Sequence, residues 1–245
     1  MTKQSGMGDR LFVNGVDLSG DIGSLGSIHG GPAVQDVTDI TQSAISRLGL
    51  LRDGGIDYTA WFDKAAGAAH KTLSTLPYTD VQMMYLRGTA IGNAAAAVIA
   101  KQVNYDPNRE ASGALSWGVS TQGNGVGLEW GEQLTAGIRT DTTATNGLGY
   151  DGLAASAFGG QAYLQVFALT GTSVTVKIQD SADNATFADV TGLTFTAATA
   201  AGTQRLQTLN TATVRRYVRA VSTGTFSNAQ FAVMFARNQT AGVLF

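Results

Sequence analysis

Apolar and polar side chains alternate along the second half of the chain, a pattern that is typical of half-buried β-strands. The alternation is clearest over residues 174–179, where valine or isoleucine fills every second position. Similar patterns predict further strands at 163–169, 187–190, 204–209, 215–222 and 229–237. Turn-forming residues at 181–184 and 222–224 lie between them, at a spacing that indicates a small β-sandwich.

The first half of the chain also favours strands. Asn14-Gly15 lies between two short apolar pieces and is a strong signal for a tight β-hairpin. One helix is predicted from Ala65 to Leu76, with Asp63 as its N-cap. Strands are predicted at 56–61, 81–86, 94–105, 114–121 and 125–131, and the glycine-rich stretch 20–31 is expected to be a loop. This half is therefore expected to be a mainly β domain with a flanking helix.

Charge is distributed unevenly between the two halves. Residues 1–150 carry 10 basic and 14 acidic side chains, whereas residues 151–245 carry 6 and 4. The stretch 140–160 is polar, rich in glycine and alanine, and without periodicity, which is typical of a linker. We therefore expect two domains, 1–145 and 161–245, joined by a linker at 146–160.

Composition narrows the classes of function. Only 14% of the residues are charged and 31 of the 245 are glycine. A surface of small neutral side chains is desolvated at low cost, which favours extensive self-association. The net charge of −2 gives no basic field for nucleic acid. Because the chain has no cysteine, disulfides, thiolate metal sites and thiol nucleophiles are excluded.

No targeting or membrane segment is visible in the sequence. The first ten residues lack the apolar core of a signal peptide. No apolar run approaches the roughly 20 residues that cross a bilayer. We therefore expect synthesis in the cytoplasm and no membrane insertion.

Catalytic motifs are also missing from the sequence. His29 and His70 have no acid or nucleophile at a fixed spacing, and neither HExxH, GxSxG nor a P-loop occurs. The stretch Gly123–Gly131 superficially resembles a phosphate-binding loop, but no helix is predicted after it, so a turn or bulge is favoured. We expect no enzymatic activity and no cofactor.

Two clusters in the second half have both a functional and a structural interpretation. Asp180, Asp183 and Asp189 are possible calcium ligands, although an ordinary aspartate turn explains them better. Arg215 and Arg219 share one face of a predicted strand with a tyrosine between them. That arrangement could bind a ligand through cation–π contacts, but a solvated sheet face is the favoured interpretation.

Five segments follow one another in a recognisable order: Asp36–Thr38, Gly49–Asp63 (GLLRDGGIDYTAWFD), Gly88–Asn93, Lys101–Asp106 and Gly125–Gly137. Together they resemble the major tail proteins, or tail tube proteins, of long-tailed, non-contractile bacteriophages, particularly actinobacterial ones. The resemblance covers most of residues 10–140. The stretch 161–245 looks like the additional immunoglobulin-like or discoidin-like β-sandwich that some of these proteins carry outside the tube.

The resemblance implies a β-barrel or β-sandwich with a flanking helix, of which six copies close into a ring. Rings would stack into a hollow tube in the virion, and DNA would pass through it without specific binding. The implied partners are further copies of the chain and the tape measure, tail tip and tail terminator proteins. Closing sheets across subunits would also remove exposed strand edges, and head-to-tail contacts between rings would propagate as a filament.

The resemblance also points to residues. Members of this family contact the adjacent ring through a loop that corresponds to residues 33–55. Composition alone leaves the apolar cluster in this loop open as core or as docking surface. The candidate assembly residues are Leu48, Leu50, Leu51, Arg52 and Asp53. An acidic lumen would repel phosphate and let DNA slide, and its candidates are Asp57, Asp63, Asp80, Glu129 and Glu132.

Two other functions fit the same sequence. A virion surface protein could bind carbohydrate or a receptor through its second domain, because some relatives of such sandwiches bind sugars. A capsid decoration or head-completion protein would differ from a tail subunit only in its partner. Polymerisation that depends on protein concentration favours the tube, retention on cell-wall glycan favours the binding module, and co-purification with capsids favours the third function.

Overall fold

The strands of the chain belong to two units that interleave along the sequence. Unit 1 comprises residues 1–20, 82–97 and 130–245, and unit 2 comprises residues 21–81 and 98–129. The structure is a computed structural model that describes residues 5–241. Nearly all of its regular structure is β, which confirms the expected mainly β fold. Within the described residues, no helix has both the length and the apolar character needed to span a membrane.

Two long strands organise unit 1. β14 (Gly160–Ser181) and β17 (Tyr217–Arg237) pair antiparallel over almost their whole length. β14 also pairs with β15 (Ala188–Thr194) and β16 (Gly202–Gln207). β17 also pairs with β11 (Arg139–Asp141), β12 (Thr145–Asn146) and β13 (Tyr150–Asp151).

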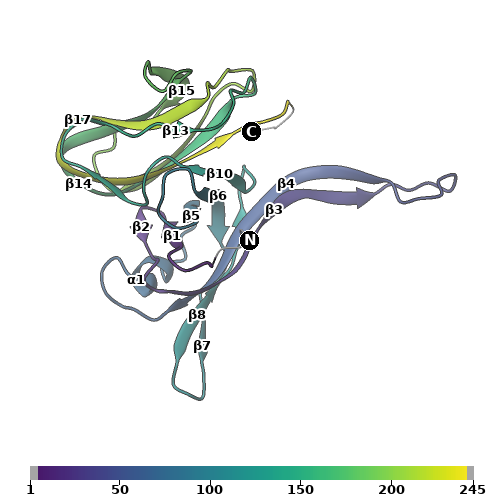
Figure 1. Cartoon of the computed structure of the whole chain (residues 1–245). Coiled ribbons are helices and arrows are strands. Elements are labelled where there is room, and N and C mark those ends of the chain that lie inside the picture. Colours follow the sequence, from purple (N-terminus) through teal and green to yellow (C-terminus); the bar gives the residue numbers. More distant parts are fainter. Residues whose placement is uncertain (1–4, 242–245) are drawn as a thin grey trace. The chain divides into compact units, whose positions relative to one another are not determined.

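β14 and β17 curve together, so that the two halves of each strand enclose one apolar core (Figure 1). Their pairing shifts register near Gly171, whose φ is +138°. A Cβ at this glycine would lie 2.4 Å from the Cα of Phe226, so only glycine fits. The core contains Val166 and Val176 from either side of this bend. The strands predicted at 163–169 and 174–179 are therefore one strand.

β17 likewise replaces two predicted strands, 215–222 and 229–237. The turn predicted at 222–224 lies inside it, because pairing with β14 continues through these residues. The turn predicted at 181–184 is present after β14, and Asn184 there has a φ of +59°.

The rest of unit 1 is built on shorter strands. β1 (Arg10–Val13) and β2 (Val16–Asp17) form the predicted hairpin, with Asn14 and Gly15 at φ +50° and +83°. β1 also pairs with β5 (Val81–Leu86). β10 (Glu129–Gln133) pairs with β17, and β6 (Ala94–Gln102) begins in unit 1. The buried Gln165 links the β1–β2 turn to β5, accepting from Gly15 N and donating to Gln82 O.

Unit 2 contains a four-stranded sheet in the order β3-β4-β8-β7. Its strands are β3 (Ile22–Asp36), β4 (Arg47–Trp61), β8 (Leu115–Val119) and β7 (Asp106–Arg109). β9 (Thr121–Gly123) pairs with the end of β6. The predicted alternation over 56–61 is confirmed, because Ile56, Tyr58 and Ala60 are buried while Trp61 is exposed.

The glycine-rich stretch 20–31, expected to be a loop, is mostly part of β3. Glycine lets this strand approach its neighbours closely. A Cβ at Gly26, for example, would lie 3.3 Å from the carbonyl oxygen of Asp57 on β4. Pairing with β4 therefore outweighs the low intrinsic strand preference of glycine. The strand predicted at 125–131 is shorter than expected and begins only at Glu129.

The predicted helix 65–76 is reduced to one turn, α1 (Ala69–Leu73). Gly67 has a φ of +77°, which a helix does not accommodate. Asp63 caps the preceding turn, accepting from Ala65 N, rather than the helix itself. His70, expected on the surface, is half-buried, with its Nδ1 3.2 Å from the hydroxyl of Tyr105.

The stretch 146–160, expected to be a linker, is paired structure in unit 1. It contributes β13, and Ser156 exchanges backbone hydrogen bonds with Val214. The two units also do not follow the expected boundary, because residues 1–20 and 82–97 group with residues 130–245. Strand pairing between distant segments, such as β1 with β5, produces this grouping.

Candidate functional site

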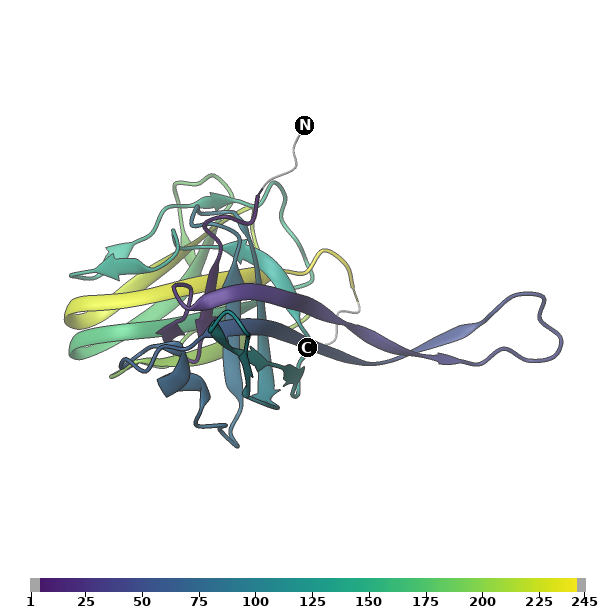
Figure 2. The same cartoon turned by 90° about the horizontal axis from the view of Figure 1, so that it is seen from below.

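The ends of β3 and β4 form a two-stranded arm, defined here as residues 30–53. The arm extends beyond the sheet to which its base belongs (Figures 1 and 2). β8 joins β4 only at Tyr58–Trp61, so among the described residues 32–36 and 47–52 pair only with each other. Both edges of the arm therefore present unpaired backbone groups, which in other proteins serve as templates for a further strand.

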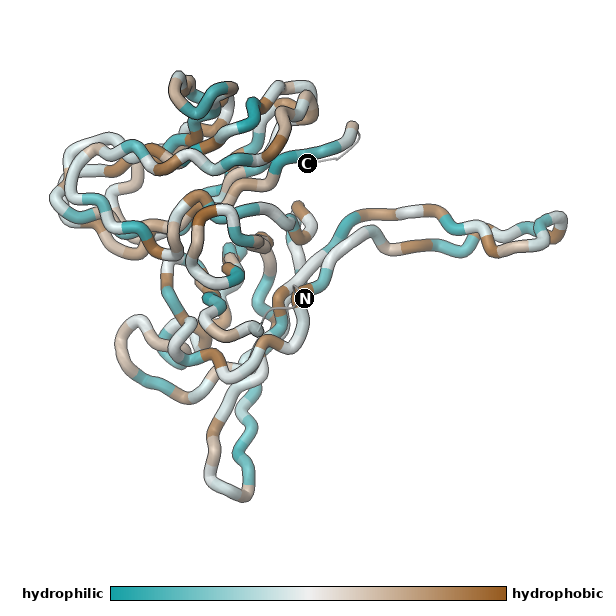
Figure 3. The backbone as a smooth tube through the Cα atoms, viewed as in Figure 1, coloured by the Kyte–Doolittle hydropathy of each residue, from teal (hydrophilic) through white to brown (hydrophobic). Residues whose placement is uncertain are grey.

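The arm carries aliphatic side chains on both faces. Val34 pairs with Gly49 and Leu48 pairs with Gln35 on the neighbouring position, so Val34 and Leu48 lie on opposite faces of the arm. The register shifts between this pairing and that of Pro32 with Arg52, where Leu50 and Leu51 are located. The three leucines Leu48, Leu50 and Leu51 are exposed, Leu51 by 88%. The apolar segments are visible along the arm in Figure 3. Four more exposed aliphatic residues belong to it: Val34, Val37, Ile40 and Ile45. A ribbon with two apolar faces has no core of its own and is typical of an interaction surface.

Local hydrogen bonds order the tip of the arm. Asp36 accepts from the hydroxyl and the backbone N–H of Thr38, and Asp39 does the same with Thr41. In each case the hydroxyl contact is the larger cause that holds the pKa of the aspartate below its usual range. The tip therefore keeps two negative charges beside its apolar residues at neutral pH.

The base of the arm is packed through glycines. A Cβ at Gly54 would lie 2.5 Å from Leu128 N, and one at Gly30 would lie 2.6 Å from Leu128 Cβ. Arg52 adds a hydrogen bond from Nη2 to the carbonyl oxygen of Leu128, 3.3 Å away. The glycine-rich stretch 123–131 thus packs against the arm base and ends within strand β10, so it lacks the helix that a phosphate loop requires.

We expect Gly54→Ala to destabilise the chain by about 1–3 kcal/mol, because the added methyl group overpacks the contact with Leu128. Gly49→Ala is the matched control on the same strand, since a Cβ at Gly49 has no atom within 4 Å. Its effect should stay within about 0.5 kcal/mol. Thermal unfolding of both variants measures the difference, and equal losses would contradict the close packing at the arm base.

Ser27, His29 and Asp57 lie together at the foot of the arm. The hydroxyl of Ser27 donates to Asp57 Oδ2 at 3.0 Å and lies 3.1 Å from His29 Nδ1. Asp57 Oδ2 is 3.7 Å from the same nitrogen. A hydrolytic triad needs the serine and the carboxylate on different ring nitrogens. This cluster therefore links β3 to β4 and does not have the geometry of a nucleophilic site.

The other predicted assembly and lumen residues lie at separate places. Asp53 Oδ1 accepts from Gly54 N. Asp80 pairs with Lys101 at 2.7 Å, and the hydrogen bond from Lys101 lowers the pKa of Asp80. Asp63 accepts a hydrogen bond from Ala65 N in its own turn. These carboxylates do not form one cluster within unit 2.

The two glutamates differ from the aspartates. Glu129 is buried, so its carboxylate does not face solvent in this chain. Glu132, in unit 1, is half-buried, and burial raises its pKa while the charge of Arg237 opposes that rise. The acidic lumen therefore stays a prediction for the five carboxylates named from the sequence.

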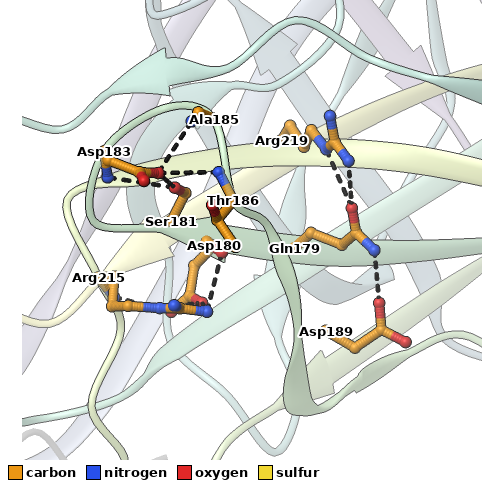
Figure 4. Close-up of polar contacts among 9 residues, drawn as sticks. All are labelled: Gln179, Asp180, Ser181, Asp183, Ala185, Thr186, Asp189, Arg215 and Arg219. Carbon is orange, nitrogen blue, oxygen red and sulfur yellow. Dashed lines mark hydrogen bonds and ion pairs between the residues drawn. The ribbon is translucent and has the colours of Figure 1, made fainter.

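The aspartates considered as calcium ligands accept hydrogen bonds or ion pairs from neighbouring residues (Figure 4). Asp183 accepts from the backbone of Thr186 and Ala185 and from Ser181, and the Thr186 contact is the largest cause of its lowered pKa. No group of three or more histidine or acidic side chains in residues 5–241 is arranged to hold a metal ion.

The other polar groups in this region form two networks (Figure 4). Asp180 is buried and pairs with Arg215 at 2.6 Å. Arg219 donates to Gln179, which donates in turn to Asp189. The arginine cluster considered as a ligand patch is therefore tied into the sheet by acceptors of its own chain.

Sequence reasoning missed the aliphatic residues of the arm outside 48–51. Val34, Val37, Ile40 and Ile45 are single apolar residues among threonine, serine, aspartate and glutamine. Isolated apolar residues do not form a periodic pattern, so nothing marked them as one surface. The available signal was the length of sequence between the glycine-rich stretch 20–31 and the strand predicted at 56–61.

No protein-family model matches the chain, and a search of curated proteins finds no relative. Among solved structures, a protein from the tail of an empty GTA particle gives a TM-score of 0.39 at 14% identity, covering 51% of this chain and 97% of that one. The Dit hub protein of phage SPP1 gives 0.32 at 11% identity, covering 93% and 98%. A component of the phage p2 baseplate gives 0.31 at 8% identity, covering 95% and 99%. Because all three TM-scores are low, the function is inferred from the residues of this chain and not from these likenesses.

Proposed function

We propose that this chain is a structural subunit of a bacteriophage tail that assembles with copies of itself into rings through the arm. The observation that carries the proposal is the uncovered aliphatic surface on both faces of a hairpin with two unpaired edges. The ordered segments that resemble tail tube proteins supply the virion context. The role is structural and not catalytic.

The energetics of the arm favour contacts that act together. Burying an aliphatic side chain contributes about 1.5–3 kcal/mol, so the four on the strands, Val34, Leu48, Leu50 and Leu51, offer roughly 6–12 kcal/mol. Association itself costs about 4–15 kcal/mol. The net free energy of one arm contact is therefore close to zero. A closed ring, in which every copy gives and receives an arm, is stable because its contacts act together. Assembly should consequently depend steeply on protein concentration.

The finer proposal is a tail tube. Six copies would close one ring, rings would stack, and DNA would pass through the hollow centre. The excess of acidic side chains in residues 1–150 supports this version, because a negative lumen repels phosphate. The tape measure, tail tip and tail terminator proteins would then be the partners that set the length and the ends of the tube.

Sedimentation velocity and negative-stain electron microscopy of the purified protein at rising concentration test the proposal. We expect monomers at low concentration, and hollow tubes of uniform width with ring striations at high concentration. Closed rings that do not stack would keep the ring-forming role and overturn the tube. Monomers at every concentration would contradict both, and their retention on cell-wall glycan would favour the surface-binding function instead.

A further inference from the structure

Unit 1 contains an apolar hollow whose lining comes from two distant parts of the sequence. Its volume is about 310 Å³, at the small end of ligand pockets. The apolar residues that line it are Ile91, Leu134, Ala136, Ile138 and Leu148. Leu148 is 74% exposed, so part of this lining is uncovered among the described residues. The hollow therefore has the size and the chemistry to receive a few aliphatic side chains.

The hollow is held in shape by hydrogen bonds behind its lining. Leu134 N donates to Val233 O on β17, and the hydroxyl of Thr135 donates to Gly137 O. Gly147 N donates to Ala220 O. A Cβ at Gly147 would lie 2.5 Å from that oxygen, so glycine lets the chain run close to β17. A preformed receptor of this kind loses little conformational entropy when it is filled.

The charges near the hollow are already paired. Arg139, which also lines it, donates to both oxygens of Asp141 and to the carbonyl oxygens of Ala220 and Thr145. The site therefore offers no uncommitted carboxylate, and its arginine is engaged, so a charged ligand gains little there. An uncharged aliphatic group is the occupant that this lining favours.

We propose that the hollow of one copy receives the aliphatic side chains of β4 from the arm of a second copy, with Leu51 as the leading contact. This inference rests on the proposed function and names the surface that accepts the arm. The chain carries both halves of the contact, an exposed aliphatic arm in unit 2 and a partly uncovered aliphatic hollow in unit 1. Contacts between two different surfaces of the same chain are heterologous and generate rings or filaments.

Because the chain has no cysteine, crosslinking between single-cysteine variants tests the contact directly. Leu51→Cys and Leu148→Cys are mixed at an assembling concentration, treated with a short bismaleimide, and mapped by mass spectrometry. We expect a dimer linked between positions 51 and 148. The matched control pairs Leu51→Cys with Leu209→Cys, since Leu209 is equally exposed in unit 1, at 78%. Linkage no greater than in this control would overturn the inference.

A variant that carries both cysteines separates contacts within a chain from contacts between chains. Linkage of 51 to 148 inside a monomer would overturn the inference, because the hollow would then accept its own arm. Imaging of unlinked wild-type protein reports on the proposed function separately. Rings or tubes without the 51–148 link would remove only this acceptor surface, whereas the lack of both would remove the proposed function as well.

Substitution of a residue that lines the hollow gives a second test, with the concentration needed for assembly as its measurement. Leu148→Asp is expected to raise the concentration needed for assembly about tenfold or more, because an aliphatic contact is lost and a charge faces the incoming leucine. Leu209→Asp should leave it unchanged. Circular dichroism of both variants verifies that they are folded. An unchanged assembly threshold in a folded Leu148→Asp protein would contradict the proposed contact.

Discussion

A chain that carries both Leu50→Asp and Leu51→Asp is expected to stay monomeric at concentrations where the wild-type protein assembles. Both side chains are exposed on the arm, so the double variant places two charges within its apolar surface. Each replaced leucine removes about 1.5–3 kcal/mol of burial, and each aspartate must be desolvated in any remaining contact. Together these losses exceed the narrow margin by which an arm contact outweighs the cost of association.

The same variant should fold normally. Both leucines are exposed in the single chain, and surface substitutions away from packed features usually change stability by less than about 0.5 kcal/mol. A double variant of Leu153 and Leu209 to aspartate is the matched control, since these residues are similarly exposed but lie in unit 1. Sedimentation velocity compares the three proteins. Assembly of the arm variant at the wild-type concentration would refute the role given to the arm.

Local signals in the sequence were reliable where a short segment determines its own conformation. Asn14-Gly15 predicts the β1–β2 hairpin because both residues accept the positive φ that the turn requires. The alternation at 56–61 and 174–179 predicts the buried face of each strand correctly, with Tyr58 and Val176 inside. In these places the local preference and the tertiary environment agree.

Predictions failed where a distant segment decides the structure. The glycines at 20–31 resemble a loop by themselves, and they become a strand only because β4 pairs with them. The helix expected at 65–76 has suitable alanines, but Gly67 at positive φ restricts it to Ala69–Leu73. The stretch 146–160 has linker composition, yet β17 and the residues just before it, 212–216, supply its hydrogen-bond partners.

The same difference between local signals and distant partners applies to the candidate site. The apolar cluster at 48–51 was identified from the sequence, although whether it formed core or surface depended on what packed against it. The hollow could not be identified, because Ile91 and Leu148 have no fixed spacing and come together only through the strands that carry their segments. A surface assembled from separate segments leaves no periodic pattern in a single sequence.

The largest loss of stability is expected from Asp141→Ala, which should lower the free energy of unfolding by about 3–5 kcal/mol. Asp141 is buried and accepts hydrogen bonds from Nε and Nη2 of Arg139, at 2.8 and 2.6 Å, and from the hydroxyl of Ser222. Removing the carboxylate leaves the Arg139 guanidinium half-buried beside Phe231 without its counter-charge. Denaturation in urea, followed by circular dichroism, measures the loss.

Asp151→Ala is the control, because its ion pair has nearly the same hydrogen-bond geometry as that of Asp141 but is exposed. Asp151 accepts from Nε and Nη2 of Arg216 at 2.7 and 2.6 Å, nearly the same distances, but both side chains are exposed. Water replaces an exposed partner, so its loss should be much smaller. Equal losses in the two variants would mean that burial does not determine how much these ion pairs contribute to stability.

Because Arg139 also lines the hollow, Asp141→Ala should in addition raise the assembly threshold under conditions where the protein remains folded. Asp151→Ala should not, and this contrast connects the stability of unit 1 to the surface that we propose accepts the arm.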